Sequence, residues 1–212
     1  MPLVAPLPAD HSDEVARVAT FFETTLGFAP NSVLTMQRRP EIAKAFTHLN
    51  RAVMDNGGRV TGEQKRLIGH LASANAGCRY CEAHTVLAAK RFGASDARLA
   101  ALWEFRHNAL FSAAEKAAFE FALAASSVPN AVDDQVAAEL HRHWSDDEIV
   151  EILGVVALFG FLNRWNDSMG TTLEAPAAEV GAAHLATRGW GVGKHRAVEG
   201  EPAPAAPGES AR

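Results

Sequence analysis

Proline spacing constrains the fold of this chain more than any other feature of its sequence. No proline falls between Pro40 and Pro129 or between Pro129 and Pro176, so two long windows lack the residue that breaks helices. Both windows are rich in alanine, and their apolar residues recur every three or four positions without the sustained alternation of a strand. The sequence therefore predicts an all-α protein.

Start and stop signals divide these windows into helices. Thr61 with Gln64 makes a capping box for a helix that runs towards Gly77, and the next helix begins around the cysteines and ends near Gly93. A long helix is capped by Ser145 and carries apolar residues through Leu162. The remaining signals predict helices over about 12–27, 31–39, 41–56, 95–102, 112–128 and 133–143.

The chain length of 212 residues suits one domain, and no composition shift marks a second. We predict a single helical domain over 1–196. The last segment, AVEGEPAPAAPGESAR, has three prolines and almost no apolar bulk, so it cannot offset the entropy lost on ordering. Residues 197–212 are predicted to be a disordered tail.

Charge and hydropathy argue against two classes of partner. Twenty basic and 25 acidic residues give a net charge of -5, with no Lys and Arg cluster able to neutralise several phosphates. The N-terminus lacks the pattern of a secretory signal, and the most apolar stretch, residues 152–162, is too short to cross a bilayer. We expect a cytoplasmic protein that binds neither nucleic acid nor membrane.

Both cysteines of the chain lie in one short motif, Cys78-Arg79-Tyr80-Cys81-Glu82-Ala83-His84. If this segment opens a helix, Cys78 and Cys81 are one turn apart and His84 is one turn further on, so the three can contact in series. A helix N-terminus and an adjacent imidazolium both lower a thiol pKa. This arrangement suits a two-cysteine redox cycle that passes through a sulfenic acid.

The same motif could also be inert packing, a zinc site or a haem attachment site. A buried cysteine pair can be inert packing. Zinc could take the two thiolates and an imidazole, with His70 or water as a fourth ligand, although the chain has no second CxxC. Haem attachment needs a histidine directly after the second cysteine, where Glu82 stands, and is discarded. We expect no metal and no organic cofactor.

The stretch KRLIGHLASANAG at 65–77, which leads into CRYCEAHT, resembles the AhpD-like alkylhydroperoxidases of the carboxymuconolactone decarboxylase family. The later segment 149–169 is similar to the family's long C-terminal helix, so the resemblance covers a CxxC-bearing core over about 61–172. It implies an AhpD-like helical bundle, a homo-oligomer (trimer or hexamer), and thiol-dependent peroxide reduction. It also implies that Cys81 becomes the sulfenic acid and that Cys78 donates a proton and then resolves it.

The chain departs from the family's motif at two positions. Arg66 stands where the family's proton relay often begins with a glutamate, and Thr85 stands where its histidine commonly lies, with His84 one residue earlier. His84 can still reach Cys81 from the other flank of the helix. A polar stripe of Glu63, Arg66, His70 and Ser73 is a candidate replacement relay, or simply a solvated helix face.

We therefore predict Cys78, Cys81, His84 and His70 as catalytic residues. The predicted function is a thiol peroxidase that takes a hydroperoxide and a thiol or disulfide reductant. A cofactor-free lyase of the decarboxylase type and a non-enzymatic redox-sensing oligomer are the alternatives. Two further features carry less weight: Tyr80, expected in the core with its hydroxyl at the surface, and a polar patch in which Arg164 and Asp167 could pair.

Overall fold

A computed structural model describes residues 2–197, and this part of the chain is all-helical, with no strand. The prediction of a single all-α domain is confirmed. Residues 198–212, which hold nearly all of the predicted tail, lie outside the described residues, so disorder there stays a prediction. The helices are α1 Asp13–Leu26, α2 Asn31–Met36, α3 Pro40–Val53, α4 Gly62–Asn75, α5 Arg79–Arg91, α6 Asp96–Ala101, α7 Ala113–Ser126, α8 Asp134–His143, α9 Asp146–Met169 and α10 Ala175–Leu185.

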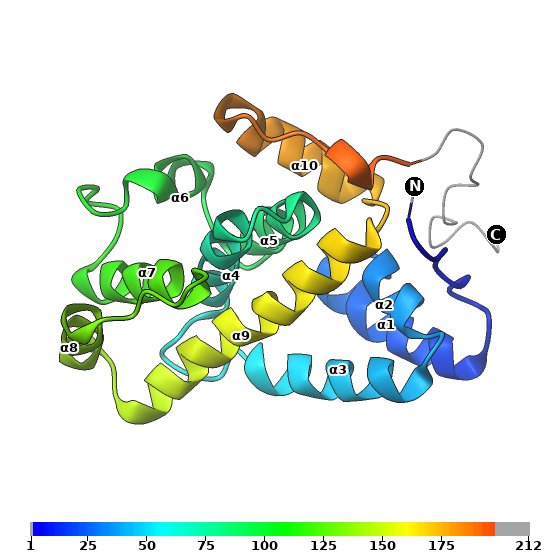
Figure 1. Ribbon diagram of the computed structural model, residues 1–212, viewed down its shortest axis with the longest axis horizontal. Helices are drawn as coiled ribbons and strands as arrows, with labels where there is room; N and C mark the ends of the chain where they lie inside the picture. Colours follow the sequence, from blue (N-terminus) through cyan, green and yellow to red (C-terminus); the bar gives the residue numbers. More distant parts are fainter. Residues whose placement is uncertain (1, 198–212) are drawn as a thin grey trace.

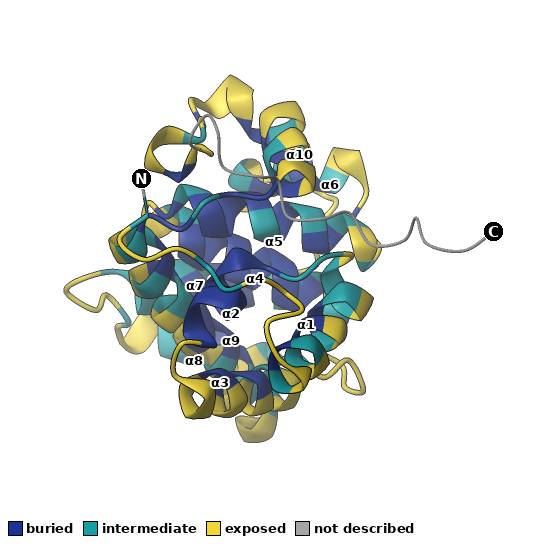
Figure 2. Ribbon diagram, turned by 90° about the vertical axis from the view of Figure 1, so that its right-hand side faces the viewer, coloured by how far each residue is buried: buried dark blue, intermediate teal, exposed yellow. Residues whose placement is uncertain are grey.

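The long helix α9 crosses the whole molecule, with α4 and α5 beside it at the centre (Figure 1). Helices α7 and α8 pack on one side of this centre, and α1, α2 and α3 lie on the other. Figure 2 shows α4 coloured as buried at the centre of the molecule, and residues 64–73 of this helix are all buried. No helix among the described residues is long and apolar enough to span a membrane.

Short polar side chains begin most helices where the sequence predicts. The residues at these positions accept a hydrogen bond from a backbone amide three residues later, which satisfies a donor that the helix leaves free. Reciprocal capping boxes form at Ser112 with Glu115 and at Ser145 with Glu148. The box predicted at Thr61 is only half formed: Thr61 Oγ1 accepts from the Gln64 backbone amide, and the described residues show no return bond from the Thr61 amide to the Gln64 side chain. The caps are Ser12, Thr61, Ser95, Ser112, Asp133 and Ser145.

Two apolar clusters hold the helices together. The larger lies between α4, α5, α7 and α9, and the smaller joins α1, α2 and α3 to Leu158 of α9. The helices α4 and α9 approach closely at Gly69, where a Cβ would lie 2.4 Å from the Phe159 ring. Any larger residue at position 69 would displace Phe159, so we expect it to cost about 1–3 kcal/mol of stability.

The helix α10 was not predicted from the sequence. Pro176 lies in its first turn, where proline needs no amide partner, and Glu174 is its N-cap. This helix packs against α5, and the chain beyond it returns so that the Leu173 amide donates to the His195 carbonyl at 2.8 Å. The C-terminal segment therefore covers the helix that carries the cysteines.

Candidate functional site

The cysteine motif opens α5, as the sequence predicts. Gly77 turns the chain with a φ of +72°, a conformation that glycine adopts without steric strain. Cys78 is then the N-cap of α5, and its amide donates to the Ser73 carbonyl at 3.1 Å. Both thiols are free and buried, and Cys81 lines a cavity whose described lining does not include Cys78. The pair thus has one sulfur facing the cavity and one behind it.

The two thiols have different proton affinities. The neighbouring Cys81 thiol and amide, one helical turn away, stabilise a charged Cys78 sulfur, which holds the pKa of Cys78 below its usual value although burial opposes the shift. Burial raises the pKa of Cys81, although Asn166 Nδ2 donates to its sulfur at 3.5 Å and opposes that effect. If the pair loses one proton, the thiolate is therefore favoured on Cys78, and Cys81 remains the protonated thiol.

Glu174 is the centre of a buried polar cluster that borders the cavity. Its Oε1 accepts from the Tyr80 hydroxyl at 2.9 Å and from the Asn31 amide at 2.5 Å, while its Oε2 lies 2.7 Å from His84 Nε2. The Tyr80 and His84 rings meet edge to face with centroids 4.2 Å apart. Contrary to the sequence-based expectation, the Tyr80 hydroxyl is buried and reaches this cluster rather than the surface.

Burial shifts the acid and the base of this cluster in opposite directions. It raises the pKa of Glu174 from 4.5 to about 7, although the hydrogen bonds from Asn31 and Tyr80 oppose the shift. It lowers the pKa of His84 from 6.5 to about 3. His84 is thus a neutral imidazole at neutral pH, which corrects the expectation that an imidazolium lowers the thiol pKa. The carboxyl of Glu174 is the group that gains or loses a proton near pH 7.

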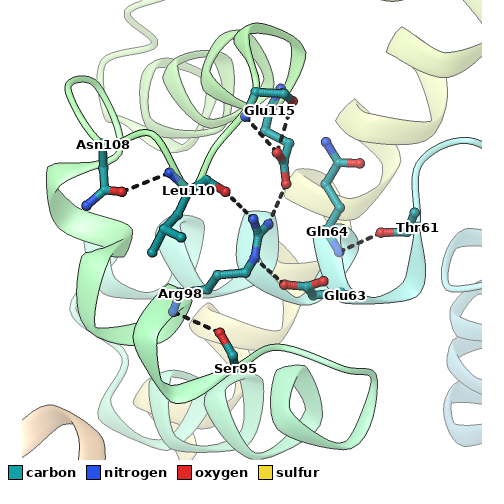
Figure 3. Close-up of polar contacts among 9 residues, drawn as sticks. Thr61, Glu63, Gln64, Ser95, Arg98, Asn108, Leu110 and Glu115 are labelled. Atoms are coloured by element: carbon teal, nitrogen blue, oxygen red, sulfur yellow. Dashed lines mark hydrogen bonds and ion pairs between the residues drawn. The ribbon is translucent and has the colours of Figure 1, made fainter.

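The predicted polar stripe on α4 is divided among separate contacts. Glu63 pairs with Arg98 at 2.6 Å, and Arg98 also binds Glu115 from α7 (Figure 3). Ser73 donates to the Gly69 carbonyl within its own helix. These contacts favour a structural role for both ends of the stripe, so a continuous relay towards Cys78 is not formed among the described residues.

His70 lies within the core, with its Nδ1 3.0 Å from Thr85 Oγ1 and its ring near Trp103. Burial lowers the pKa of His70 to about 4, so it is neutral at neutral pH. No hydrogen bond joins His70 or His84 to either cysteine in the described part of the chain. The structure brings His84 to the cavity beside Cys81 and leaves His70 on the far side of Thr85.

The cavity has a volume of about 370 Å³. Its inner end is formed by Cys81, Tyr80, His84 and Asn166, and its walls are mostly aromatic or aliphatic. This volume and lining are typical of small-molecule sites. The wall residues include Phe21, Phe22, Leu26, Val33, Phe46, Met54, Phe92, Phe159 and Leu162.

Sequence reasoning missed Glu174, and it misread the pairing of Asp167. Glu174 precedes Pro176 in Glu174-Ala175-Pro176, a pattern that fits a helix start and was the available signal for α10. Asp167 contacts Lys194 at 2.9 Å rather than Arg164. Within residues 2–197, no group of three or more His, Cys, Asp or Glu side chains is arranged to hold a metal ion.

The chain is similar to several known proteins. A profile of the carboxymuconolactone decarboxylase family matches residues 40–124. The debrominase Bmp8 is 34% identical, with a TM-score of 0.77 over 84% of this chain and 95% of Bmp8. A cysteine-to-alanine variant of Bmp8, in complex with 2,3,4-tribromopyrrole, has a TM-score of 0.78 and 33% identity over 85% of this chain and 96% of that one.

Two further proteins are similar over part of the chain or in fold. An alkylhydroperoxidase AhpD core protein from Ralstonia eutropha, itself uncharacterized, has a TM-score of 0.68 at 23% identity over 81% of this chain and 88% of that one. The uncharacterized protein YnjA of Escherichia coli is 33% identical over 93 residues, which are 43% of this chain and 50% of YnjA. The chain thus matches about half the length of that curated relative.

The fold and the cysteine pair define this molecule as an AhpD-like helical protein. The chain belongs to the carboxymuconolactone decarboxylase family, a family of enzymes.

Proposed function

We propose that this protein is a cofactor-free thiol reductase. It reduces an electrophile bound in the cavity and is itself oxidised to a Cys78–Cys81 disulfide. The observation that carries the proposal is the asymmetry of the pair: Cys81 faces an apolar cavity, and Cys78 lies behind it with no exposed surface. A substrate can therefore meet only one sulfur, while the other is held within reach of that first sulfur.

The first step needs a thiolate on Cys81. The Cys78 sulfur, whose pKa is lowered by the neighbouring Cys81, takes the proton of the Cys81 thiol as Cys81 attacks. The amide of Asn166 donates to the Cys81 sulfur and stabilises its developing charge. Burial opposes any charge on Cys81 at rest, so the thiolate forms only as the substrate reacts.

The first candidate substrate is an organic hydroperoxide. Attack of Cys81 on the outer oxygen breaks the O–O bond and gives a Cys81 sulfenic acid, and the departing alkoxide takes a proton to leave as an alcohol. The Cys78 thiol then attacks the sulfenic sulfur and releases water as the disulfide forms. An external dithiol returns the pair to its reduced state by thiol–disulfide exchange.

Glu174 and His84 are suited to supply the proton that the alkoxide needs. The carboxyl of Glu174 titrates near pH 7, and His84 Nε2 lies 2.7 Å from it. A group with a pKa near the working pH is an efficient general acid. The imidazole of His84 borders the cavity and can pass the proton from Glu174 to the leaving oxygen. We assign no step to His70, whose catalytic role stays a prediction.

A second candidate substrate is a halogenated aromatic ring, which the similarity to the debrominase Bmp8 favours. Here the Cys81 thiolate would take the halogen from a ring that gains a proton at the same carbon, giving a sulfenyl halide. The Cys78 thiol would then displace halide and form the same disulfide. Both candidates use two thiols for one two-electron reduction, and only their products differ.

The deciding experiment follows both thiols and products. Reduced protein is mixed with cumene hydroperoxide or with 2,3,4-tribromopyrrole, and free thiols, the Cys78–Cys81 disulfide, alcohol and bromide are measured. We expect one disulfide per alcohol or per bromide released, complete loss of reaction in Cys81→Ser, and a sulfenic acid trapped by dimedone on Cys81 in Cys78→Ser after peroxide.

The same measurements separate the alternatives. Thiols that stay reduced with both substrates refute the reductase proposal. A decarboxylase-type lyase would release carbon dioxide from a lactone acid while both thiols remain reduced. A redox sensor would form the disulfide once, change its structure, and fail to turn over when dithiothreitol is supplied.

A further inference from the structure

The cavity has a charged end opposite its reactive end. Arg66 from α4 lines it, together with Asn56 and Asp55 from the segment that follows α3. The Arg66 guanidinium lies over the ring of Phe92, which is the C-cap of α5, whereas Cys81 lies in the first turn of the same helix. Asp55 and Asn56 are exposed, so this end is the mouth of the cavity. A bound molecule therefore meets water and Arg66 at one end and a thiol at the other.

Arg66 is a buried arginine that has no carboxylate partner among the described residues. Arg59, Arg98 and Arg106 each pair with a glutamate, whereas no carboxylate lies within 4.0 Å of the Arg66 guanidinium in residues 2–197. Yet the residue is only 6% exposed. A cation removed from water without a counter-ion is destabilising, so an anion beside it would recover part of that free energy.

The guanidinium is fixed in place and still has free donors. Its Nη1 donates to Asn56 Oδ1 at 2.7 Å and to the Gly62 carbonyl at 3.0 Å, and its carbon lies 3.6 Å from the centroid of the Phe92 ring. The nitrogens Nη2 and Nε have no hydrogen-bond partner among the described residues. Burial lowers the pKa of Arg66 to about 10, so it remains charged at neutral pH.

Other charged groups at the mouth do not cancel this one. The Asp55 side chain is exposed, and its Oδ1 accepts from the Asn56 amide. Arg51, also a lining residue, places its guanidinium over the Phe21 ring at 4.2 Å. Two cations and one exposed carboxylate leave the mouth positive.

We propose that Arg66 binds the carboxylate of a small carboxylic acid whose apolar body fills the aromatic part of the cavity and points towards Cys81. Arginine presents paired donors that match the two oxygens of a carboxylate, and a carboxylate would supply the counter-ion that the protein lacks. The proposal names the substrate class for the reductase proposed above, but the binding itself does not require the thiols to react.

Binding of matched acids and amides tests this directly. The probes are 2-naphthoate with 2-naphthamide and octanoate with octanamide, measured by calorimetry on the full chain with Cys81→Ser so that no thiol chemistry occurs. We expect each acid to bind about 10- to 100-fold more tightly than its amide, the range for a charge-assisted bidentate contact.

Substitutions assign this preference to one residue. In Arg66→Met the acid should lose its advantage while the amide keeps its affinity, which also shows that the cavity is still formed. Arg66→Lys should retain part of the preference, and Arg39→Met, which removes an exposed cation outside the cavity, should retain all of it.

Three results would overturn the proposal. One is an acid-to-amide ratio that is unchanged in Arg66→Met, another is a preference for the amides in the parent protein, and the third is no binding by either pair at millimolar concentration. Failure of the reductase proposal is a separate result, because inert thiols would leave the acid preference intact.

Discussion

Replacing Glu174 with glutamine should expose a pH dependence of stability that the Glu174–His84 pair cancels in the wild type. The pKa of Glu174 is raised to about 7 in the folded protein, so its contribution is fully present below pH 4.5 and is lost as the pH rises through 7. The pKa of His84 is lowered to about 3, so its contribution is present above pH 6.5 and is lost as the pH falls.

The two effects oppose each other over one pH window. Between pH 4.5 and 6.5 the folded pair holds one proton, on the carboxyl of Glu174, and the unfolded chain also holds one, on the imidazole of His84. Glutamine keeps the shape and the hydrogen bonds to Tyr80 and Asn31, but it binds no proton. As the pH is lowered through this window, the free energy of unfolding of Glu174→Gln should then fall by about 1.4 kcal/mol for each pH unit, relative to wild type.

Urea denaturation at pH 6.5 and pH 5 measures this difference. Over this interval the variant should lose about 2 kcal/mol more than the wild type does. Glu179→Gln is the matched control, because Glu179 is an exposed carboxylate of the same helix with no ion-pair partner in the described residues, and it should follow the wild type. Parallel curves for Glu174→Gln and wild type would refute the assignment of a shared proton.

Further predictions concern the reaction and the assembly. His84→Ala should slow disulfide formation with hydroperoxide by about 100-fold, which is the contribution of a positioned acid or base. A comparable loss in His70→Ala would instead support the hypothesis that the polar stripe on α4 supplies the proton. Asn166→Leu removes the donor to the Cys81 sulfur, so alkylation by iodoacetamide should show a higher thiol pKa and a rate about tenfold lower, and an unchanged pH profile would contradict that role. The exposed apolar face of α9, which includes Phe161, predicts a homo-oligomer, so light scattering should give a trimer or hexamer that Phe161→Glu weakens, and a monomer at micromolar concentration would contradict it.

Local signals in the sequence were sufficient for most helices and for the cysteine pair. Caps such as Ser112 and Ser145 act over three residues, and the Cys78–Cys81 spacing is itself one helical turn, so neither depends on distant contacts. The placement of Cys81 towards a cavity and Cys78 away from it was not predictable in this way, because it depends on how α5 packs against α9 and α1.

The acid of the site was missed for the same reason. His84 and Glu174 are 90 residues apart in the chain, and the Asn31 amide that binds Glu174 is 143 residues away from it. No periodicity or spacing reports such contacts. His70 is a different case: its place on the helix before the motif suggested a relay, and its Nδ1 lies 3.0 Å from Thr85 Oγ1, a contact that spacing alone did not indicate. Its catalytic role stays a prediction.

Under the proposed thiol reductase function, the burial of Cys78 gives the oxidising substrate and the reductant a single path to the site. A disulfide between Cys78 and Cys81 would present only the Cys81 sulfur to the cavity, so a dithiol that re-reduces the enzyme must enter by the path that the oxidising substrate used. Substrate and reductant then occupy one space in turn and exclude each other. Steady-state kinetics should be ping-pong, with each reactant inhibiting competitively against the other at high concentration.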